Sequence, residues 1–360
     1  MNSFVEEEKL HRLHGLDFCR AVFMLLGLFY HSALIYSDSY VWRVSSLESS
    51  YFLSYLYEFI HAFRMEAFYL ISGFFYLLVF SKRSTGFLNE RLLRIFPPLL
   101  VCGLLINPIM NYLSYERVYD WKEWNYFIEG QWLGHLWFLG NLIGYFIISY
   151  PLCFLMIRCN EIREKYIVMC FWFVVPFFSL LALVVSKKLF NGSFLFLTFD
   201  TLFYYYFYFL FGCLCFKNKI RFINVLTYRN AILSAAVYLA VTFAINLNYF
   251  SYLDPNYLKA ASKLSSGFLV LAMIAITYNL GKSGSSLTRE LSDSSYTIYL
   301  LHQPLIVVIY FFIFKELNVY FAFEYILIVI MTFMIAFMTH YYFIKKSPSL
   351  LFLFNGVRKR

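Results

Sequence analysis

The first long apolar segment of the chain reads LDFCRAVFMLLGLFYHSALIYS, from Leu16 to Ser37. It is long enough to cross a bilayer as a helix, because a spanning helix needs about 20 mostly apolar residues. The segment nevertheless carries Asp17, Arg20 and His31. A charge at bilayer depth costs on the order of 3 kcal/mol or more, so such residues usually face the protein interior and take part in its chemistry. The segment therefore predicts a membrane helix that forms one wall of an active site.

Helical geometry places Arg20 and His31 on the same face of this segment. At about 100° per residue, the eleven steps between them return to within about 20° of the starting direction, about 16 Å further along the axis. Met24 and Gly27 fall on the same stripe, and Asp17 lies one turn below Arg20. Because Gly27 has no side chain, we expect a gap in the stripe where another part of the chain or a ligand lies close.

The composition extends this interpretation to all 360 residues. Hydrophobic residues make up 61% of the chain and charged residues 14%, whereas soluble domains carry roughly 25% charged residues. The sequence predicts an all-α, polytopic integral membrane protein with one membrane-embedded domain, residues 1–360. The net charge of +9 falls in short basic clusters between apolar segments, which is typical of membrane topology and not of nucleic-acid binding.

Ten segments satisfy the spanning length, and the basic residues between them indicate an orientation. The segments are 16–36, 52–80, 92–113, 133–157, 167–186, 199–216, 230–247, 262–280, 294–314 and 322–344. With both termini cytoplasmic, 20 of the 30 Lys and Arg residues lie on the cytoplasmic side and 8 on the outer side, with Arg20 and Arg64 inside the membrane. The opposite orientation would reverse this asymmetry. We therefore expect ten transmembrane helices with both termini in the cytoplasm.

More charged residues follow near the outer end of the second segment, namely Glu58, His61, Arg64 and Glu66. The first three are spaced three residues apart, so neighbouring members share a helix face. Charges at one membrane level are costly unless they are paired, so we expect these groups to pair with one another or with the first segment. Two interpretations stay open: a histidine–carboxylate general base, or an ion-pair network that only fastens the first two helices together.

Three other positions have a chemical and a structural interpretation. Arg91 and Arg94 begin the third segment and either set the topology or hold a phosphate group. His135 and His302 each stand alone in apolar or hydroxyl-rich surroundings. For both histidines the sequence favours a hydrogen-bonded interior residue over a catalyst. The sequence shows no set of His, Cys and carboxylate residues with the spacing of a metal site.

The longest predicted outer loop, residues 114–132, combines acidic residues with Trp121, Trp124 and Trp132. Tryptophans at a membrane edge usually anchor the interface, and the sequence favours that role here. The alternative is a rim on which sugar rings stack at a substrate entrance.

Five short motifs, taken in order, resemble the membrane acyltransferase-3 family, whose multi-span members transfer acyl groups to sugars outside the cytoplasm. The motifs are Leu16-Asp17 followed by Arg20-x10-His31, Ile71-Ser72-Gly73-Phe74, Arg91-x-x-Arg94-Ile-x-Pro97, His135-Leu-Trp137-Phe138-Leu, and Ser295-Tyr296 with Tyr299-Leu-Leu-His302-Gln-Pro304. Together they cover most of the chain. The stretch from His31 through Trp42 to Gly73 is similar to the family members that add succinyl groups to osmoregulated periplasmic glucans.

The resemblance implies that His31 is the catalytic histidine, supported by Arg20 and Asp17. It also implies that Arg91 and Arg94 hold the donor from the cytoplasm. The donor would be an acyl-CoA, succinyl-CoA or acetyl-CoA, acting as a substrate, with no bound cofactor. The acceptor would be a periplasmic or cell-surface glycan. Membrane lipids and, by analogy, glucan synthesis proteins would be partners, and the location would be the bacterial inner membrane.

We therefore predict a membrane O-acyltransferase in which His31, oriented by Glu58 or Asp17, is the general base. Arg20 or Arg64 would stabilise the negative charge that develops on the carbonyl oxygen. No serine or cysteine pairs obviously with His31, which favours direct attack over an acyl-enzyme. The alternative function is a glycan or lipid exporter or flippase, in which the intramembrane charges line a path. A third interpretation is a structural or sensor protein.

Overall fold

Long helices account for nearly all of the regular structure. A computed structural model describes residues 2–38, 40–114, 123–190, 192–247, 253–317 and 319–358. Within these residues, ten helical stretches are long and apolar enough to cross a membrane. Each predicted segment falls inside one of them to within one residue, so the prediction of ten spans is confirmed.

The ten stretches combine α-helices with short 3-10 (η1, η3) and π-helical (η2, η4, η5, η6) turns. They are α1 (Asn2–Ala33) with η1 (Leu34–Tyr36), α2 (Tyr51–His61) with α3 (Arg64–Lys82), α4 (Phe87–Val101) with η2 (Cys102–Ile106) and α5 (Asn107–Leu113), α6 (Trp124–Ile128) with η3 (Gln131–Leu136) and α7 (Trp137–Met156), α8 (Glu164–Met169) with η4 (Cys170–Val174) and α9 (Val175–Leu189), α10 (Phe199–Lys217), α12 (Tyr228–Asn246), α13 (Pro255–Gly281), α14 (Ser286–Ile309) with η5 (Tyr310–Phe314), and α15 (Phe321–Met338) with η6 (Thr339–Ile344). Two shorter helices, α11 (Lys219–Val225) and α16 (Pro348–Asn355), and the antiparallel strand pair β1 (Ser193–Phe194) and β2 (Leu197–Thr198) complete the described fold.

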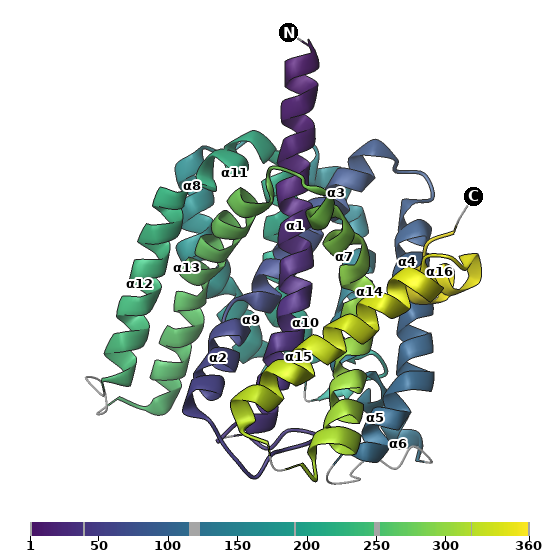
Figure 1. The fold of residues 1–360 in the computed structure, drawn as a ribbon. Helices are drawn as coiled ribbons and strands as arrows, with labels where there is room; N and C mark the ends of the chain where they lie inside the picture. The colour runs from purple at the N-terminus through teal and green to yellow at the C-terminus, as the bar shows by residue number, and fades with distance from the viewer. Residues whose placement is uncertain are drawn as a thin grey trace.

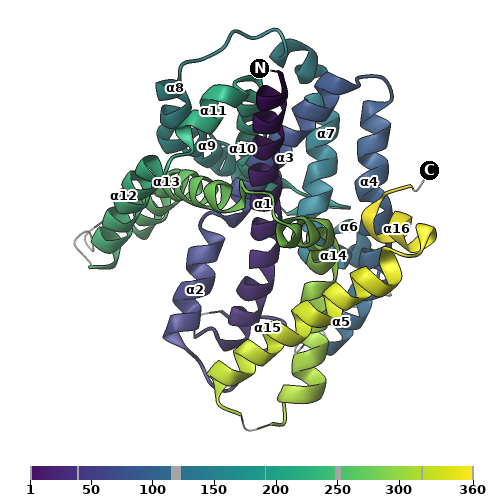
Figure 2. The same cartoon turned by 45° about the horizontal axis from the view of Figure 1, so that its top comes forward.

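Helix α1 runs through the middle of the bundle. In both views α12 and α13 lie to one side of it, and α4, α14 and α16 lie to the other (Figures 1 and 2). The chain begins and ends toward the same end of the bundle (Figure 1), as an even number of spans requires. Which side of the membrane this end faces remains a prediction.

Two glycines hold α3 and α10 together by letting their backbones touch. A Cβ at Gly73 would collide with the carbonyl oxygen of Phe209, and one at Gly212 would collide with that of Leu70. Small residues permit this close approach of membrane helices, where packing rather than water exclusion drives association. Gly73 belongs to one of the five motifs, and its role here is to bring α10 against α3.

The second span is broken where the sequence predicted a continuous face. Helix α2 ends at His61 and α3 begins at Arg64, with Ala62 and Phe63 in a turn between them. Glu58 and His61 are exposed, whereas Arg64 and Glu66 are buried. The prediction that neighbouring members of this group share one helix face is therefore wrong across the break.

Part of the predicted outer loop, residues 115–122 with Trp121, lies outside the described residues. Trp124 is 81% exposed, as an interface anchor or a stacking rim would be. Trp132 is buried and its Nε1 donates to the carbonyl oxygen of Leu195 at 3.1 Å. Neither predicted role fits Trp132, because its ring packs inside the fold.

Candidate active site

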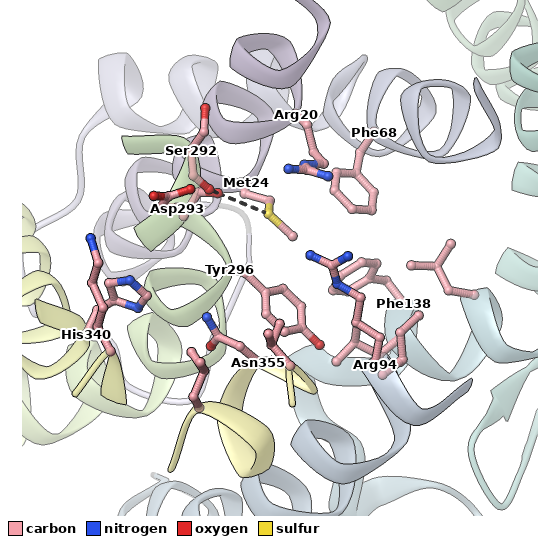
Figure 3. Close-up of a pocket in the computed structure, with 17 residues that line it drawn as sticks. Arg20, Met24, Phe68, Arg94, Phe138, Ser292, Asp293, Tyr296, His340 and Asn355 are labelled. Atoms are coloured by element: carbon pink, nitrogen blue, oxygen red, sulfur yellow. Dashed lines mark hydrogen bonds between the residues drawn. The ribbon is translucent and has the colours of Figure 1, made fainter. Parts of the chain in front are cut away.

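A cavity of about 470 Å³ opens between α1, α4 and α14. Its lining includes Arg20 and Met24 of α1, Arg94 of α4, and Asp293 and Tyr296 of α14. Figure 3 shows the guanidinium groups of Arg20 and Arg94 extending into the same space, with Asp293 on another wall. Two cations that are far apart in the sequence therefore meet in one cavity.

The C-terminal helix forms part of the cavity wall. Asn355 of α16 lines the cavity, and its Oδ1 accepts a hydrogen bond from the Thr297 hydroxyl at 2.9 Å. Gly356, with φ of +63°, lies so close to the backbone of Arg94 that a Cβ there would collide with it. These contacts place α16 against the middle of α4, beside Arg94.

Asp17 and Arg91 lie elsewhere than the sequence predicted. Asp17 pairs with Arg20 across 3.2 Å, and it lies fourteen residues before His31, about 21 Å along the helix axis. The prediction that Asp17 orients His31 is therefore wrong. The Arg91 guanidinium packs 5.6 Å from the ring centre of Phe87 and does not line the cavity. Of the predicted donor-holding pair, only Arg94 faces this cavity.

Gly27 lies on α1 between Met24, which lines the cavity, and His31, which does not. The cavity reaches Met24 on α1 and does not include His31, which lies two turns further on. A Cβ at Gly27 would lie 2.6 Å from Arg64 Nη1 and 3.3 Å from His302 Nε2. The predicted gap in the stripe is therefore filled by the side chains of Arg64 and His302.

The His31 ring is half-buried among aromatic side chains. It stacks on Trp42, with ring centres 5.6 Å apart, and meets Tyr30 edge-on at 4.7 Å. The ring centre of His302 lies 5.2 Å away. His31 Nδ1 is buried and has no hydrogen-bond partner among the described residues.

His31, His302 and His135 form a row, which we call the histidine row. The ring centres of His302 and His135 are also 5.2 Å apart. His302 Nδ1 lies 2.5 Å from the Tyr299 carbonyl oxygen, and His135 Nε2 lies 3.1 Å from that of Leu300. Since a carbonyl oxygen only accepts, both contacting nitrogens carry hydrogen, and in the neutral rings the other nitrogens hold lone pairs. His302 Nε2 and His135 Nδ1 are buried and have no partner in the part of the chain that the structure describes.

Pro304 explains why the Leu300 carbonyl is available to His135. In a continuous helix this oxygen would accept from the backbone N–H of residue 304, but proline has none. The oxygen accepts from His135 Nε2 instead. The sequence His302-Gln-Pro304 thus supplies one histidine of the row directly and anchors another, His135 of η3.

Arg64 is a buried cation at the centre of this arrangement. Its side chain is 8% exposed, and its Cζ lies 4.8 Å from the ring centre of Tyr30. The His61 ring stacks on the same tyrosine at 5.7 Å. Across the described ranges Arg64 forms no ion pair, and its Nε has no hydrogen-bond partner.

The predicted carboxylate partners of His31 face elsewhere. Glu58 is exposed on α2, and Glu66 is fully buried and accepts from the Tyr204 hydroxyl at 3.1 Å. In the described ranges neither carboxylate forms an ion pair or a hydrogen bond with a histidine or arginine. The expected pairing of these charges with one another is therefore wrong.

The family model of an acyltransferase domain matches residues 13–341, most of the chain, which confirms the resemblance seen in the motifs. The chain belongs to the acyltransferase-3 family. Glucans biosynthesis protein C of Escherichia coli (strain K12) is 29% identical over 324 residues, or 82% of this chain and 82% of that protein. The protein of that name from Salmonella typhi is also 29% identical, over 322 residues, with the same shares covered. No solved structure matches the chain.

This acyltransferase-3 protein is therefore a multi-pass membrane acyltransferase. Its motifs on α1, α4, α7 and α14 supply the cavity and the histidine row. We had favoured a structural role for His135 and His302, yet the fold brings both beside the predicted catalytic histidine. Each belongs to a motif that carries the family resemblance, and those motifs were the available signal.

Proposed function

We propose that this acyltransferase-3 protein transfers an acyl group from a cytoplasmic acyl-CoA to a hydroxyl group of an envelope glycan, with His31 as general base. This proposal rests on the positions of Arg20 and His31 along one face of α1. One face of that helix presents Arg20 to a cavity at one level and His31 to the histidine row at another. A donor and an acceptor that approach from opposite ends could meet along this face.

The donor side is the cavity. Arg20 and Arg94 provide positive charge in its lining, and the phosphate groups of a CoA thioester would bind there through charge-assisted hydrogen bonds. The lining also includes the apolar side chains of Met24, Phe68 and Phe138 (Figure 3), which suit the uncharged arm and the thioester. The acyl carbonyl would then advance along α1 toward Gly27.

The reaction needs a base that takes the proton of the acceptor hydroxyl. It also needs a cation or hydrogen-bond donor that stabilises the carbonyl oxygen of the acyl group. His31 removes the proton as the acceptor oxygen forms a bond to the carbonyl carbon. Arg64, which is buried beside Gly27, stabilises the negative charge on the carbonyl oxygen. The carbon–sulfur bond then breaks, and His31 returns the proton to the thiolate, so that CoA leaves as a thiol. Water is kept away by the aromatic rings of Tyr30 and Trp42.

The acceptor and the acyl group are proposed from the relatives. Their name refers to glucan biosynthesis, which supports a glucan as the acceptor. We propose that this glucan lies in the periplasm and that the protein lies in the bacterial inner membrane. Succinyl is the favoured acyl group and acetyl is the alternative. Family membership favours an enzyme over the exporter or flippase that the sequence left open.

Transfer by purified protein in liposomes tests this proposal. We expect glucan incubated with the wild-type protein and succinyl-CoA or acetyl-CoA to gain the mass of the corresponding acyl group in mass spectrometry. His31→Ala should abolish the product, a loss of about 100-fold or more as expected for a general base. The variant should still elute as a folded monodisperse protein. Near-normal product from His31→Ala, or glycan moved across the membrane without a change in mass, would contradict the proposal.

A further inference from the structure

The His302 ring lies 5.2 Å from the His31 ring, centre to centre, and the proposed reaction gives it no role. We propose that His302 is a positioning residue, which accepts a hydrogen bond from His31 Nδ1–H through its Nε2 and so directs His31 Nε2 at the acceptor hydroxyl. The inference rests on the proposed function, because it assigns the partner of the proposed base.

Within the described ranges, each of the two rings has one unpartnered nitrogen available for this contact. His31 Nδ1 and His302 Nε2 are both buried, and neither has a partner in the described residues. Their ring centres lie 5.2 Å apart with the planes tilted by 44°. Hydrogen bonds in a catalytic site without substrate are often long and tighten when substrate binds. A small rotation of the half-buried His31 ring would bring its Nδ1 toward His302.

His302 is held in the one tautomer that can accept. Its Nδ1–H donates to the Tyr299 carbonyl, so Nε2 of the neutral ring carries the lone pair. The side chain is 1% exposed, and the His135 ring packs against it edge-on at 5.2 Å. His302 Nε2 is therefore a rigidly held hydrogen-bond acceptor beside the half-buried ring of His31.

A neutral acceptor also fits the charge of the site better than a carboxylate would. His302 Nε2 and Arg64 Nη1 both lie beside Gly27. A carboxylate at the His302 position would form an ion pair with Arg64 and remove that cation from the carbonyl oxygen of the donor. An imidazole lone pair orients His31 and forms no ion pair with Arg64. This explains why Glu58, Asp17 and Glu66 can lie elsewhere.

Two variants of His302 separate positioning from a structural role. In His302→Asn the side-chain amide can still donate to the Tyr299 carbonyl, but it lacks an acceptor at the Nε2 position. In His302→Gln the longer side chain places an amide oxygen near the Nε2 position. We expect kcat of the Asn variant to fall about 100-fold while KM for donor and acceptor changes less than about threefold. The Gln variant should be about tenfold more active than the Asn variant.

The control is Tyr145→Phe, which removes a buried hydroxyl that donates to the Leu202 carbonyl at 2.6 Å, away from the histidine row. It should keep the wild-type kcat. Equal activity of the Asn and Gln variants, or higher activity of the Asn variant, would overturn the inference. If the wild-type protein forms no acylated glycan, the proposed function itself fails, and this assignment fails with it.

Discussion

Arg64 is a charged side chain in an environment that is unusual for a cation. It is buried, sits against the Tyr30 ring and has no ion-pair partner in the described ranges. Removing a charge from water costs several kcal/mol unless a partner compensates it. An active site in which negative charge develops during the reaction can retain such an unpaired cation to stabilise that charge. The cation then lowers the free energy of unfolding. Activity and stability should therefore respond in opposite directions when this charge is removed.

The substitution Arg64→Met tests this opposition. Methionine has a similar volume and no charge, so the free energy of unfolding should be unchanged or higher by about 1–4 kcal/mol. Transfer of the acyl group should fall about 100-fold, the loss typical of one oxyanion-stabilising donor. Thermal unfolding in detergent and kcat from glycan mass spectrometry give the two readouts. A less stable variant that retains full activity would contradict the role of Arg64.

At the scale of the element, α14 shows how one proline shapes a site on another helix. Pro304 lies inside α14 and leaves the Leu300 carbonyl to His135 of η3, while Tyr299 donates from its hydroxyl to the His135 carbonyl at 2.6 Å. Two neighbouring residues of α14 thus hold the backbone and the ring of one histidine. By removing one backbone hydrogen bond from α14, Pro304 thus frees the carbonyl that holds the ring of His135 in the histidine row.

We expect Pro304→Ala to stabilise α14 and to weaken this connection. The new N–H competes with His135 Nε2 for the Leu300 carbonyl, so transfer activity should fall roughly tenfold, equivalent to about one hydrogen bond. The matched control is Pro151→Ala, a proline inside α7 whose side chain is exposed. Both variants should unfold at the same or a higher temperature than the wild type. Equal activity in both would show that the freed carbonyl has no functional role.

At the scale of the molecule, the proposed reaction depends on which end of the bundle meets the cytoplasm. The cavity that holds Arg20 and Arg94 is also lined by Asn355 and Val357, close to the end of the chain, and the chain begins and ends toward the same end of the bundle (Figure 1). An acyl-CoA donor requires this end to be cytoplasmic. The excess of basic residues predicts that orientation.

The single exposed cysteine of the described residues, Cys159, reports the orientation directly. It lies between α7 and α8, toward the same end as the cavity, whereas Cys19, Cys102 and Cys213 are among the buried ones. A membrane-impermeant maleimide should label Cys159 in inverted membrane vesicles and not in intact spheroplasts. Cys159→Ser should abolish the signal. Labelling in spheroplasts would reverse the orientation and exclude a cytoplasmic donor for this cavity.

The ten spans, the stripe of α1 from Arg20 to His31 and the family could all be predicted from the sequence, because apolar length, helical periodicity and short motifs are local properties of the chain. The surroundings of His31 could not. The break after His61 turned Arg64 inward and left Glu58 exposed, and the packing of α14 and η3 brought His302 and His135 to the site. Such contacts depend on which helices pack together and on how each buried polar atom is satisfied, and residue spacing within one segment does not contain that information.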